Sequence, residues 1–271
     1  MRKPLRHINL NKWESDELSH FYILPKNIEI MKHLFLFLAT FPLLAQKKIK
    51  PEVTELWEPV PEVVIPGNLS VPPSDAIVLF DGTDLSQWIN ADSGQVANWI
   101  INSDRSMTVQ KDGGIETKEE FRSIQLHIEW RTPKEIKGKG QGRGNSGVYF
   151  QKTYEIQILD SYNNITYSNG QAASIYKQSI PLVNASRPPG EWQTYDIIFN
   201  EPQYDVKGKR LKKGSFTVFH NEVLVQNNVE IQGTTEYIGP PKFRNVKIPK
   251  RLYLQDHGNP VSYRNIWLRK L

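Results

Sequence analysis

The residues between positions 144 and 162 carry the side chains that are best suited to chemistry in this sequence. Read with a period of two, this stretch (GNSGVYFQKTYEIQILDSY) places apolar groups on one side and amides, a carboxylate and a phenol on the other. Successive side chains of a strand point to opposite faces, so we expect one strand with a core face and a polar face. The expected polar face, which suits sugar hydroxyls, consists of Tyr149, Gln151, Glu155 and Gln157, with Asp160 and Tyr162 just beyond it. The alternation alone is equally consistent with an ordinary half-buried strand.

A second polar group follows an apolar run near the C-terminus. Tyr253, Gln255 and His257 share one parity and alternate with two leucines. An imidazole titrates near neutral pH, so His257 is a candidate catalytic residue and Gln255 a candidate substrate ligand. Asp256 could orient the imidazole or cap the turn, and the alternative for His257 is a turn histidine that faces solvent.

The sequence leaves metal binding open. It contains no close ligand spacing such as HxH or HExxH, yet it does contain acidic and histidine side chains that could bind a metal ion. The side chains that could meet around one divalent metal ion are Glu155, Asp160, Asp256 and His257. A structural calcium ion near Asp81 or Asp84 is equally compatible with the sequence. No other cofactor is indicated.

The composition excludes several classes of function. The 271 residues include no cysteine, which rules out disulfides, thiol nucleophiles and thiolate metal sites. The net charge of +5 comes largely from two basic stretches, 131–143 and 207–213. They resemble solvated loops and accompany no nucleic-acid-binding motif, so we expect no nucleic-acid partner.

The N-terminal part predicts export. From Met31 the chain has a short basic start, an apolar run at positions 34–44 and a polar continuation, which is typical of a secretory signal peptide at 31–45. The apolar run is too short to span a bilayer, so we expect a periplasmic or secreted protein with no membrane association after cleavage. Residues 1–30 are interpreted as a gene-model extension that precedes the true start. Residues 46–75 are rich in proline and predict a linker.

The rest of the chain, 76–271, predicts an all-β domain. Short alternating runs recur at regular spacing, and no helical pattern approaches 10 residues. The stretch 111–113 predicts a hairpin turn, Leu85 and Trp88 predict one helical turn, and 165–189 predicts long loops at the rim of a site. These features favour a β-sandwich or jelly roll.

Five tryptophans are expected to fill the core of this sandwich, namely Trp88, Trp99, Trp130, Trp192 and Trp267. Trp192 is the exception, which we consider as a sugar-stacking platform instead, because the rim loop leads into it.

Five segments together resemble one family. They are 79–88 (LFDGTDLSQW), 144–162, 190–202 (GEWQTYDIIFNEP), 219–230 (FHNEVLVQNNVE) and 254–269 (LQDHGNPVSYRNIWLR). In this order they are similar to the 3-keto-disaccharide hydrolases, formerly a domain of unknown function. The resemblance implies a concanavalin A-like jelly roll with short helical turns and long rim loops, export to the periplasm, and action on glycosides whose sugar carries a ketone at C3.

Conventional glycoside hydrolysis is a weaker expectation. Glycosidases of the laminarinase type, which the resemblance suggests as fold relatives, carry alternating acids on a central strand, whereas this chain has the amide Gln157 at the middle position. Retaining hydrolysis needs two carboxyl groups about 5 Å apart. Glu155 and Asp160 differ by five positions and would face opposite sides of a regular strand.

A 3-keto sugar requires less from the protein, since its ketone acidifies the hydrogen on C2 and the C1 substituent is β to the carbonyl. One base, either Glu155 or His257, and donors for the enolate and leaving oxygens would suffice. Glu155 would need a pKa raised by burial or a neighbour. The candidate donors are Asn145, Gln157, Gln255 and Arg264.

Two other classes of function stay open. A non-catalytic carbohydrate-binding module would use amides and a stacking aromatic without a base. A helper subunit of a sugar oxidoreductase would show no turnover in isolation. In each case an oligosaccharide or glycoside is the expected ligand, and a sugar 3-dehydrogenase is the expected pathway neighbour of the enzyme.

Overall fold

The computed structural model describes residues 49–68, 71–243 and 250–271. It divides the chain into two compact units, Met1–Pro61 and Glu62–Leu271. The described part of the first unit contains a short 3-10 helix, η2 (Pro51–Thr54). The expected extension at 1–30 and signal peptide at 31–45 lie outside the described residues.

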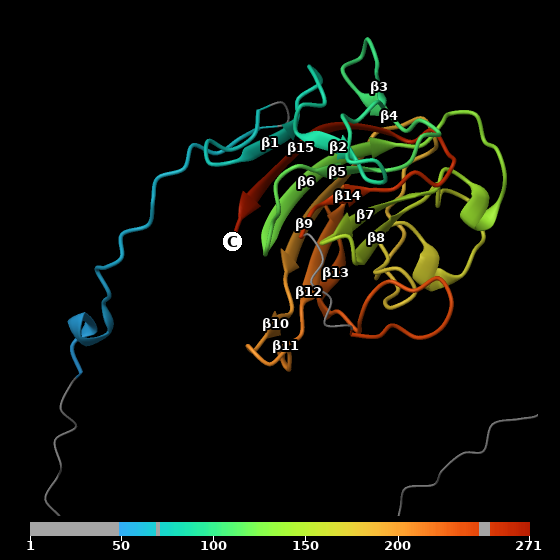
Figure 1. Ribbon diagram of the computed structural model, residues 1–271. Coiled ribbons are helices and arrows are strands. Elements are labelled where there is room, and N and C mark those ends of the chain that lie inside the picture. Colours follow the sequence, from blue (N-terminus) through green and yellow to red (C-terminus); the bar gives the residue numbers. More distant parts are fainter. Residues whose placement is uncertain (1–48, 69–70, 244–249) are drawn as a thin grey trace, which may run out of the picture. The chain divides into compact units, whose positions relative to one another are not determined.

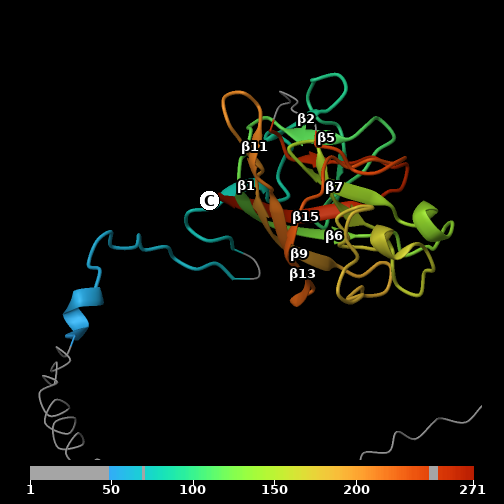
Figure 2. The ribbon, with the colours of Figure 1, turned by 90° about the horizontal axis from the view of Figure 1, so that it is seen from below.

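The second unit is built on two antiparallel sheets (Figures 1 and 2). The larger, eight-stranded sheet runs in the order β13-β12-β9-β6-β15-β4-β3, with β1 paired to β15. Its strands are β1 (Ile77–Phe80), β3 (Ile100–Ile101), β4 (Met107–Thr108), β6 (Ile124–Arg131), β9 (Gln193–Asn200), β12 (Ser215–His220), β13 (Val223–Glu230) and β15 (Ser262–Lys270).

The smaller sheet has five strands in the order β2-β5-β14-β7-β8. Its strands are β2 (Trp88–Asn90), β5 (Ile115–Thr117), β14 (Tyr253–Leu254), β7 (Ser146–Phe150) and β8 (Tyr154–Ile158). A separate hairpin joins β10 (Gln203–Tyr204) to β11 (Arg210–Lys212), and the 3-10 helices η3 (Gly140–Gly142) and η4 (Ser168–Gly170) lie in the loops. The prediction of an all-β jelly-roll sandwich is confirmed.

Apolar side chains from both sheets form one core. Phe150 of β7 lies 5.0 Å, between ring centroids, from both Phe199 of β9 and Phe216 of β12. The hydroxyl of Tyr195 on β9 donates a hydrogen bond of 2.8 Å to the backbone oxygen of Gln157 on β8. Burial of each such large side chain stabilises the fold by about 1.5 to 3 kcal/mol, so the core holds the two sheets face to face and leaves their outer faces for polar groups.

The stretch 144–162 forms two strands, so the expectation of a single strand was wrong. β7 and β8 are joined by a tight turn in which the Thr153 amide donates to the Phe150 oxygen at 3.1 Å. Gln151 and Lys152 have φ of 55° and 51° in this turn. Neither is glycine or asparagine, so the sequence carries no turn signal here. The register pairs Tyr149 with Glu155 and Gly147 with Gln157, which keeps Tyr149, Glu155 and Gln157 on one face.

The stretch 111–113 also differs from its expected role as a hairpin turn. β4 before it belongs to the eight-stranded sheet and β5 after it to the five-stranded sheet, so the segment crosses between the sheets. The expected helical turn at Leu85 is a single turn in which the Trp88 amide donates to the Leu85 oxygen at 2.9 Å.

Three of the five tryptophans lie in the core as expected, namely Trp88, Trp99 and Trp130. Trp267 lies half-buried on the outer face of the eight-stranded sheet, stacked on the ring of His127. Trp192 is also half-buried, with the guanidinium groups of Arg131 and Arg264 over its ring. The prediction of a core position was therefore wrong for Trp267, whereas Trp192 was the exception to that prediction. The sequence alone does not show which face of the sheet Trp267 occupies.

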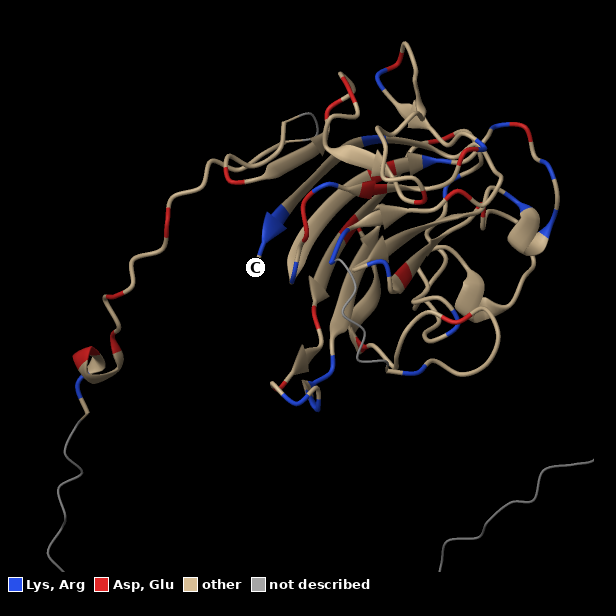
Figure 3. Ribbon diagram, in the orientation of Figure 1, with Lys and Arg blue, Asp and Glu red and all other residues tan. Residues whose placement is uncertain are grey.

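Charged residues lie mainly on loops and strand ends (Figure 3). The basic stretch 207–213 forms the exposed tip and second strand of the β10–β11 hairpin. Within the described part of the chain, no helix has the length and apolar character needed to cross a bilayer.

Candidate active site

Two rows of side chains cross the outer face of the five-stranded sheet. The rim segment 173–176 extends the sheet beyond β8 through backbone hydrogen bonds to Glu155 and Gln157. The strand register shows that the first row consists of Glu116, Tyr253, Tyr149, Glu155 and Tyr176. It places in the second row Gly114, Gln255, Gly147, Gln157 and Ser174. Carboxyl and phenol groups thus lie beside a row of amides and small residues.

A glycine makes room for the carboxyl group of Glu155. A Cβ atom at Gly147 would lie 2.6 Å from the Oε1 atom of Glu155 and 3.0 Å from the Cε2 atom of Tyr149. The first distance is shorter than a van der Waals contact, and the second is shorter than an ordinary one. Gly147 therefore lets both side chains lie across the sheet surface.

Glu155 is an acid in an apolar and phenolic environment. Its side chain is almost completely buried, and this burial raises the pKa of the carboxyl group to about 8, although a hydrogen bond from the Tyr149 hydroxyl acts in the opposite direction. The negative charge of Glu155 in turn contributes to the raised pKa values of the phenols of Tyr253, Tyr176 and Tyr167. A carboxyl group that titrates near pH 8 can exchange a proton with a substrate near neutrality.

Buried acceptor atoms without partners lie in the second row. Among the described residues, neither the Oε1 atom of Gln157 nor that of Gln255 has a hydrogen-bond partner. The orientation of Gln157 is fixed, because its Nε2 donates at 2.9 Å to Gln141, whose own Nε2 donates to the Gly170 oxygen. The Nε2 atom of Gln255 donates to the Tyr149 hydroxyl at 3.4 Å. Buried acceptors normally have donors, so these two oxygens are free to accept hydrogen bonds from a hydroxyl group or from water.

Lys177, which directly follows the rim segment, was not identified as a candidate from the sequence. The Nζ atom of Lys177 lies 4.5, 5.5 and 5.6 Å from the ring centroids of Tyr237, Tyr167 and Tyr176. Such contacts hold a cation over aromatic faces. The signal was absent because 165–189 has no periodicity, and only the folded loop brings these phenols together.

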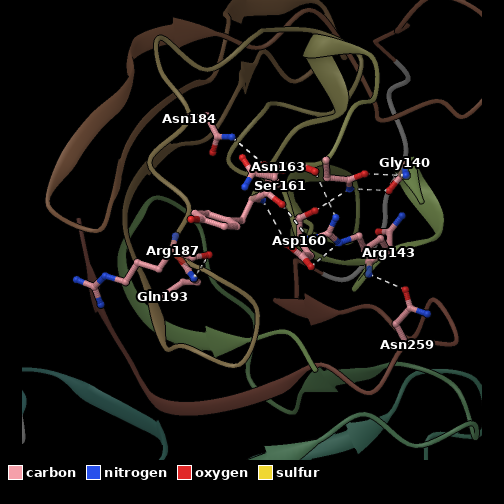
Figure 4. A network of polar contacts seen from close by, with 12 residues as sticks. Gly140, Arg143, Asp160, Ser161, Asn163, Asn184, Arg187, Gln193 and Asn259 are labelled. Carbon is pink, nitrogen blue, oxygen red and sulfur yellow. Dashed lines mark hydrogen bonds and ion pairs between the residues drawn. The ribbon is translucent and has the colours of Figure 1, made fainter. Parts of the chain in front are cut away.

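Asn145, Asp160 and Tyr162 were expected to bind substrate, but the contacts of their side chains and backbone lie within the rim loops, and Figure 4 shows Asp160 beside Arg143 there. The Arg143 guanidinium pairs with the Asp160 carboxylate at 2.6 Å and donates to the Tyr162 backbone oxygen at 2.9 Å. The Asn145 side chain donates at 2.6 Å to the backbone oxygen of Gln141. These contacts hold Gln141 against Gln157, so the three residues support the site through the loop.

Three other expected ligands lie away from Glu155. Gln151 occupies the β7–β8 turn, where its side chain donates to the carboxylate of Glu201 at 2.8 Å. Trp192 and Arg264 lie together on the outer face of the eight-stranded sheet, where Arg264 is paired with Glu129. Because that face and the Glu155 face are on opposite sides of the sandwich, the expectation that these residues share one site was wrong.

His257 lies exposed in the loop after β14. Both side-chain oxygens of Asp256 accept backbone hydrogen bonds, from Gly258 at 2.7 Å and from Gly113 at 3.3 Å, so this aspartate caps the turn. Among the described residues, no hydrogen bond orients the His257 ring. Of the two candidate bases, Glu155 is therefore the one that the fold positions.

The described residues contain no group of three or more His, Asp or Glu side chains close enough to hold a metal ion. The four candidate ligands therefore do not form such a group. Asp81 and Asp84 instead accept hydrogen bonds from Thr83 and Ser86 in their own turns.

Comparison with known proteins places this chain in a family. The sequence profile of the 3-keto-alpha-glucoside-1,2-lyase-like domain matches residues 75–269. No curated protein matches the chain.

Solved structures add two similar proteins, both from Parabacteroides distasonis ATCC 8503 and both described as a putative glycosyl hydrolase. The first, solved at 2.13 Å resolution, is 48% identical over 82% of this chain and 97% of its own, with a TM-score of 0.78. The second, solved at 1.70 Å resolution, is 18% identical over 73% of this chain and 94% of its own, with a TM-score of 0.54, and supports the fold alone. The chain belongs to the family of 3-keto-alpha-glucoside-1,2-lyase-like domains.

Proposed function

We propose that this protein is an exported enzyme that cleaves 3-keto-glycosides, with Glu155 as the base that removes the C2 hydrogen. The observation that carries the proposal is a buried carboxyl group whose pKa is raised to about 8. It lies beside two buried amide oxygens that have no partner among the described residues. The family match and the glycosyl hydrolase description of the 48% identical protein support a carbohydrate substrate.

The chemistry balances without a second carboxylate. The Glu155 carboxylate takes the C2 proton, and the electron pair moves onto the C3 oxygen as an enolate. The enolate then expels the C1 oxygen, which leaves with a proton as the free aglycone, and a C1–C2 double bond forms. Addition of water across this bond gives net hydrolysis, and its omission gives elimination. Tyr149, whose hydroxyl donates a hydrogen bond to Glu155, is a phenol that can relay a proton.

Substrate binding would use the second row. The Oε1 atoms of Gln157 and Gln255 can accept hydrogen bonds from sugar hydroxyls, and the Glu155 carboxyl group lies over Gly147 beside them. A 3-keto sugar keeps hydroxyls at C2, C4 and C6 for such contacts. The amides therefore position the ring while Glu155 approaches C2.

A two-carboxylate glycosidase mechanism fits this face poorly. The other acid in the first row is Glu116, which is three strands from Glu155, or about 14 Å at the usual strand spacing. Glu116 is also ion-paired with Arg251 and Lys152. Retaining and inverting glycosidases place their carboxyl groups about 5 to 9.5 Å apart.

Export and substrate supply complete the proposal. The apolar run at 34–44 with its basic start supports secretion through a signal peptide at 31–45. The substrate's ketone must come from oxidation of a C3 hydroxyl, so a sugar 3-dehydrogenase is the reaction partner that the chemistry requires.

The test compares a 3-keto-glucoside with its unoxidised parent glucoside, using the chain from Gln46 to Leu271. We expect aglycone release from the keto substrate alone, at a rate that falls at least 100-fold in Glu155→Gln and changes little in His257→Ala. Equal cleavage of the parent glucoside would indicate a conventional glycosidase. Saturable binding without release would indicate a carbohydrate-binding module, and full activity in Glu155→Gln would remove Glu155 from the mechanism.

A further inference from the structure

A cavity lies on the outer face of the eight-stranded sheet, on the opposite side of the sandwich from Glu155. Its volume is about 510 Å³, within the range of ligand pockets. The residues that line it come from β1, β6, β15 and nearby loops, and include Val78, Asp104, Arg105, Glu129, Arg264 and Trp267.

Trp267 gives this cavity an aromatic wall that is held in place. The His127 ring stacks on the indole with centroids 5.1 Å apart and planes 13° from parallel. His127 is itself fixed by a 2.7 Å hydrogen bond to Asp196. On the other side, Trp267 pairs in register with Val78 of β1, which is 41% exposed and lines the same cavity. A rigid indole beside open space is a suitable surface for stacking a ligand ring.

A β-bulge brings polar groups to the same place. The register of β15 against β6 shifts between Arg264 and Trp267, and Asn265 within the shift has φ of 47°. Bulges change the direction of side chains. Here Asn265 and Arg264 each donate to one oxygen of the Glu129 carboxylate, at 2.9 and 2.7 Å. The carboxylate is thereby presented at the wall of the cavity.

The charges around the cavity compensate one another. Arg264 is paired with Glu129, and Asp104 at the same wall is paired with Arg131. Burial acts to raise the pKa of Glu129, but hydrogen bonds from His127, Asn265 and Arg264 outweigh it and hold the pKa at about 2. Glu129 is therefore a permanent acceptor at neutral pH, unlike Glu155. The wall offers paired donors and acceptors together with an indole.

We propose that this cavity is a second carbohydrate site, which binds a neutral saccharide ring by stacking on Trp267 and by hydrogen bonds to Glu129 and Arg105. A charged ligand would find no excess of opposite charge in this cavity. The hydroxyl groups of a neutral sugar can both donate and accept hydrogen bonds, so they suit a wall that offers donors and acceptors together. The site would hold part of a longer glycan while the Glu155 face acts on a sugar elsewhere. This proposal does not depend on the chemistry at Glu155.

The experiment measures binding of cellobiose and of maltose, as neutral disaccharide probes, to the Glu155→Gln chain by isothermal titration calorimetry and saturation-transfer NMR. Trp267→Leu keeps an apolar side chain but removes the flat ring, and Val78→Trp fills the cavity from the exposed strand β1. We expect each to weaken the binding of at least one probe 10-fold or more. Ile198→Ala is the matched control, because Ile198 is 39% exposed on the outer face of the same sheet and does not line the cavity.

Thermal unfolding of each variant separates lost binding from lost folding, and Val78→Trp keeps the test valid if Trp267→Leu is unstable. Binding that persists in both cavity variants would overturn the proposal and assign the probe to the Glu155 face. Absence of binding of both disaccharides to the Glu155→Gln chain at millimolar concentration would overturn it as well.

Discussion

Tyr149 and Glu155 lie directly opposite one another on β7 and β8, and the phenol hydroxyl donates to the buried carboxyl group. Direct cross-strand neighbours have Cβ atoms about 5 Å apart, so the contact is built into the register of the hairpin. Two effects of opposite sign therefore determine the pKa of Glu155. Burial raises it, and the Tyr149 hydrogen bond lowers it, with a balance near 8.

Tyr149→Phe should move the pH dependence of cleavage. Loss of the hydroxyl removes the contact that lowers the pKa of Glu155, so the alkaline rise in kcat/KM should shift to higher pH than in the wild type, where it lies at about 8. At pH 7 the rate should fall, because a smaller fraction of the enzyme carries the carboxylate. A pH series from 6 to 10 measures the shift. Tyr253→Phe serves as the control, and a shift of the same size there would argue against a specific contact.

Glu155→Gln should stabilise the fold at alkaline pH. The folded pKa of about 8 lies above the ordinary glutamate value of 4.5, so the folded state retains a proton that the unfolded state loses. Wild-type stability should therefore decrease as the pH rises from about 4.5 to about 8, by roughly 1.4 kcal/mol per unit at most, and then level off. Denaturant unfolding should show the variant equal to wild type at pH 4 and more stable by a few kcal/mol at pH 8.5. A constant difference at both pH values would contradict the raised pKa.

Gly147→Ala should disable the site without unfolding the protein. The new methyl group would lie 2.6 Å from the Oε1 atom of Glu155, so the carboxyl group must move. We expect kcat to fall at least 10-fold while the melting temperature changes by only a few degrees. Gly142→Ala is the matched control, because no atom lies within 4 Å of the Cβ position there. If both substitutions reduced kcat equally, the activity would not depend on the placement of the Glu155 carboxyl group over Gly147.

Asp160→Ala should act mainly on stability. Asp160 and Arg143 form a buried pair, and removal of one partner leaves a buried charge, which costs about 3 to 5 kcal/mol. The loop that carries Gln141 should loosen, so KM should rise more than kcat falls. The pH profile of kcat/KM should keep its apparent pKa near 8. A changed pKa would mean that Asp160 acts on the proton transfer itself.

Part of this site could be predicted from the sequence. The alternation in β7 and β8 identifies Tyr149, Glu155 and Gln157. The turn leaves the odd-numbered residues of both strands on the same face, so the prediction holds even though the turn was not recognised. The alternation at 253–257 also predicts correctly that Gln255 faces the same side as these residues, because β14 lies beside β7.

Other parts of the site required the folded structure. Parity separates the inner from the outer face of a strand but does not show which sheet the strand joins, so Trp192 and Arg264 were wrongly grouped with Glu155. Gln151 was misplaced because its turn uses residues without glycine or asparagine. Lys177 and Gln141 lie in loops without periodicity, where only tertiary contacts fix their positions.

The measurement that tests the role of Glu155 most directly follows the C2 hydrogen of a 3-keto-glucoside by NMR in D₂O. With the wild-type protein we predict deuterium at C2 of the sugar together with aglycone release, and with Glu155→Gln neither. Aglycone release with the original hydrogen retained at C2, or exchange that continues unchanged in Glu155→Gln, would contradict the assignment of Glu155 as the base.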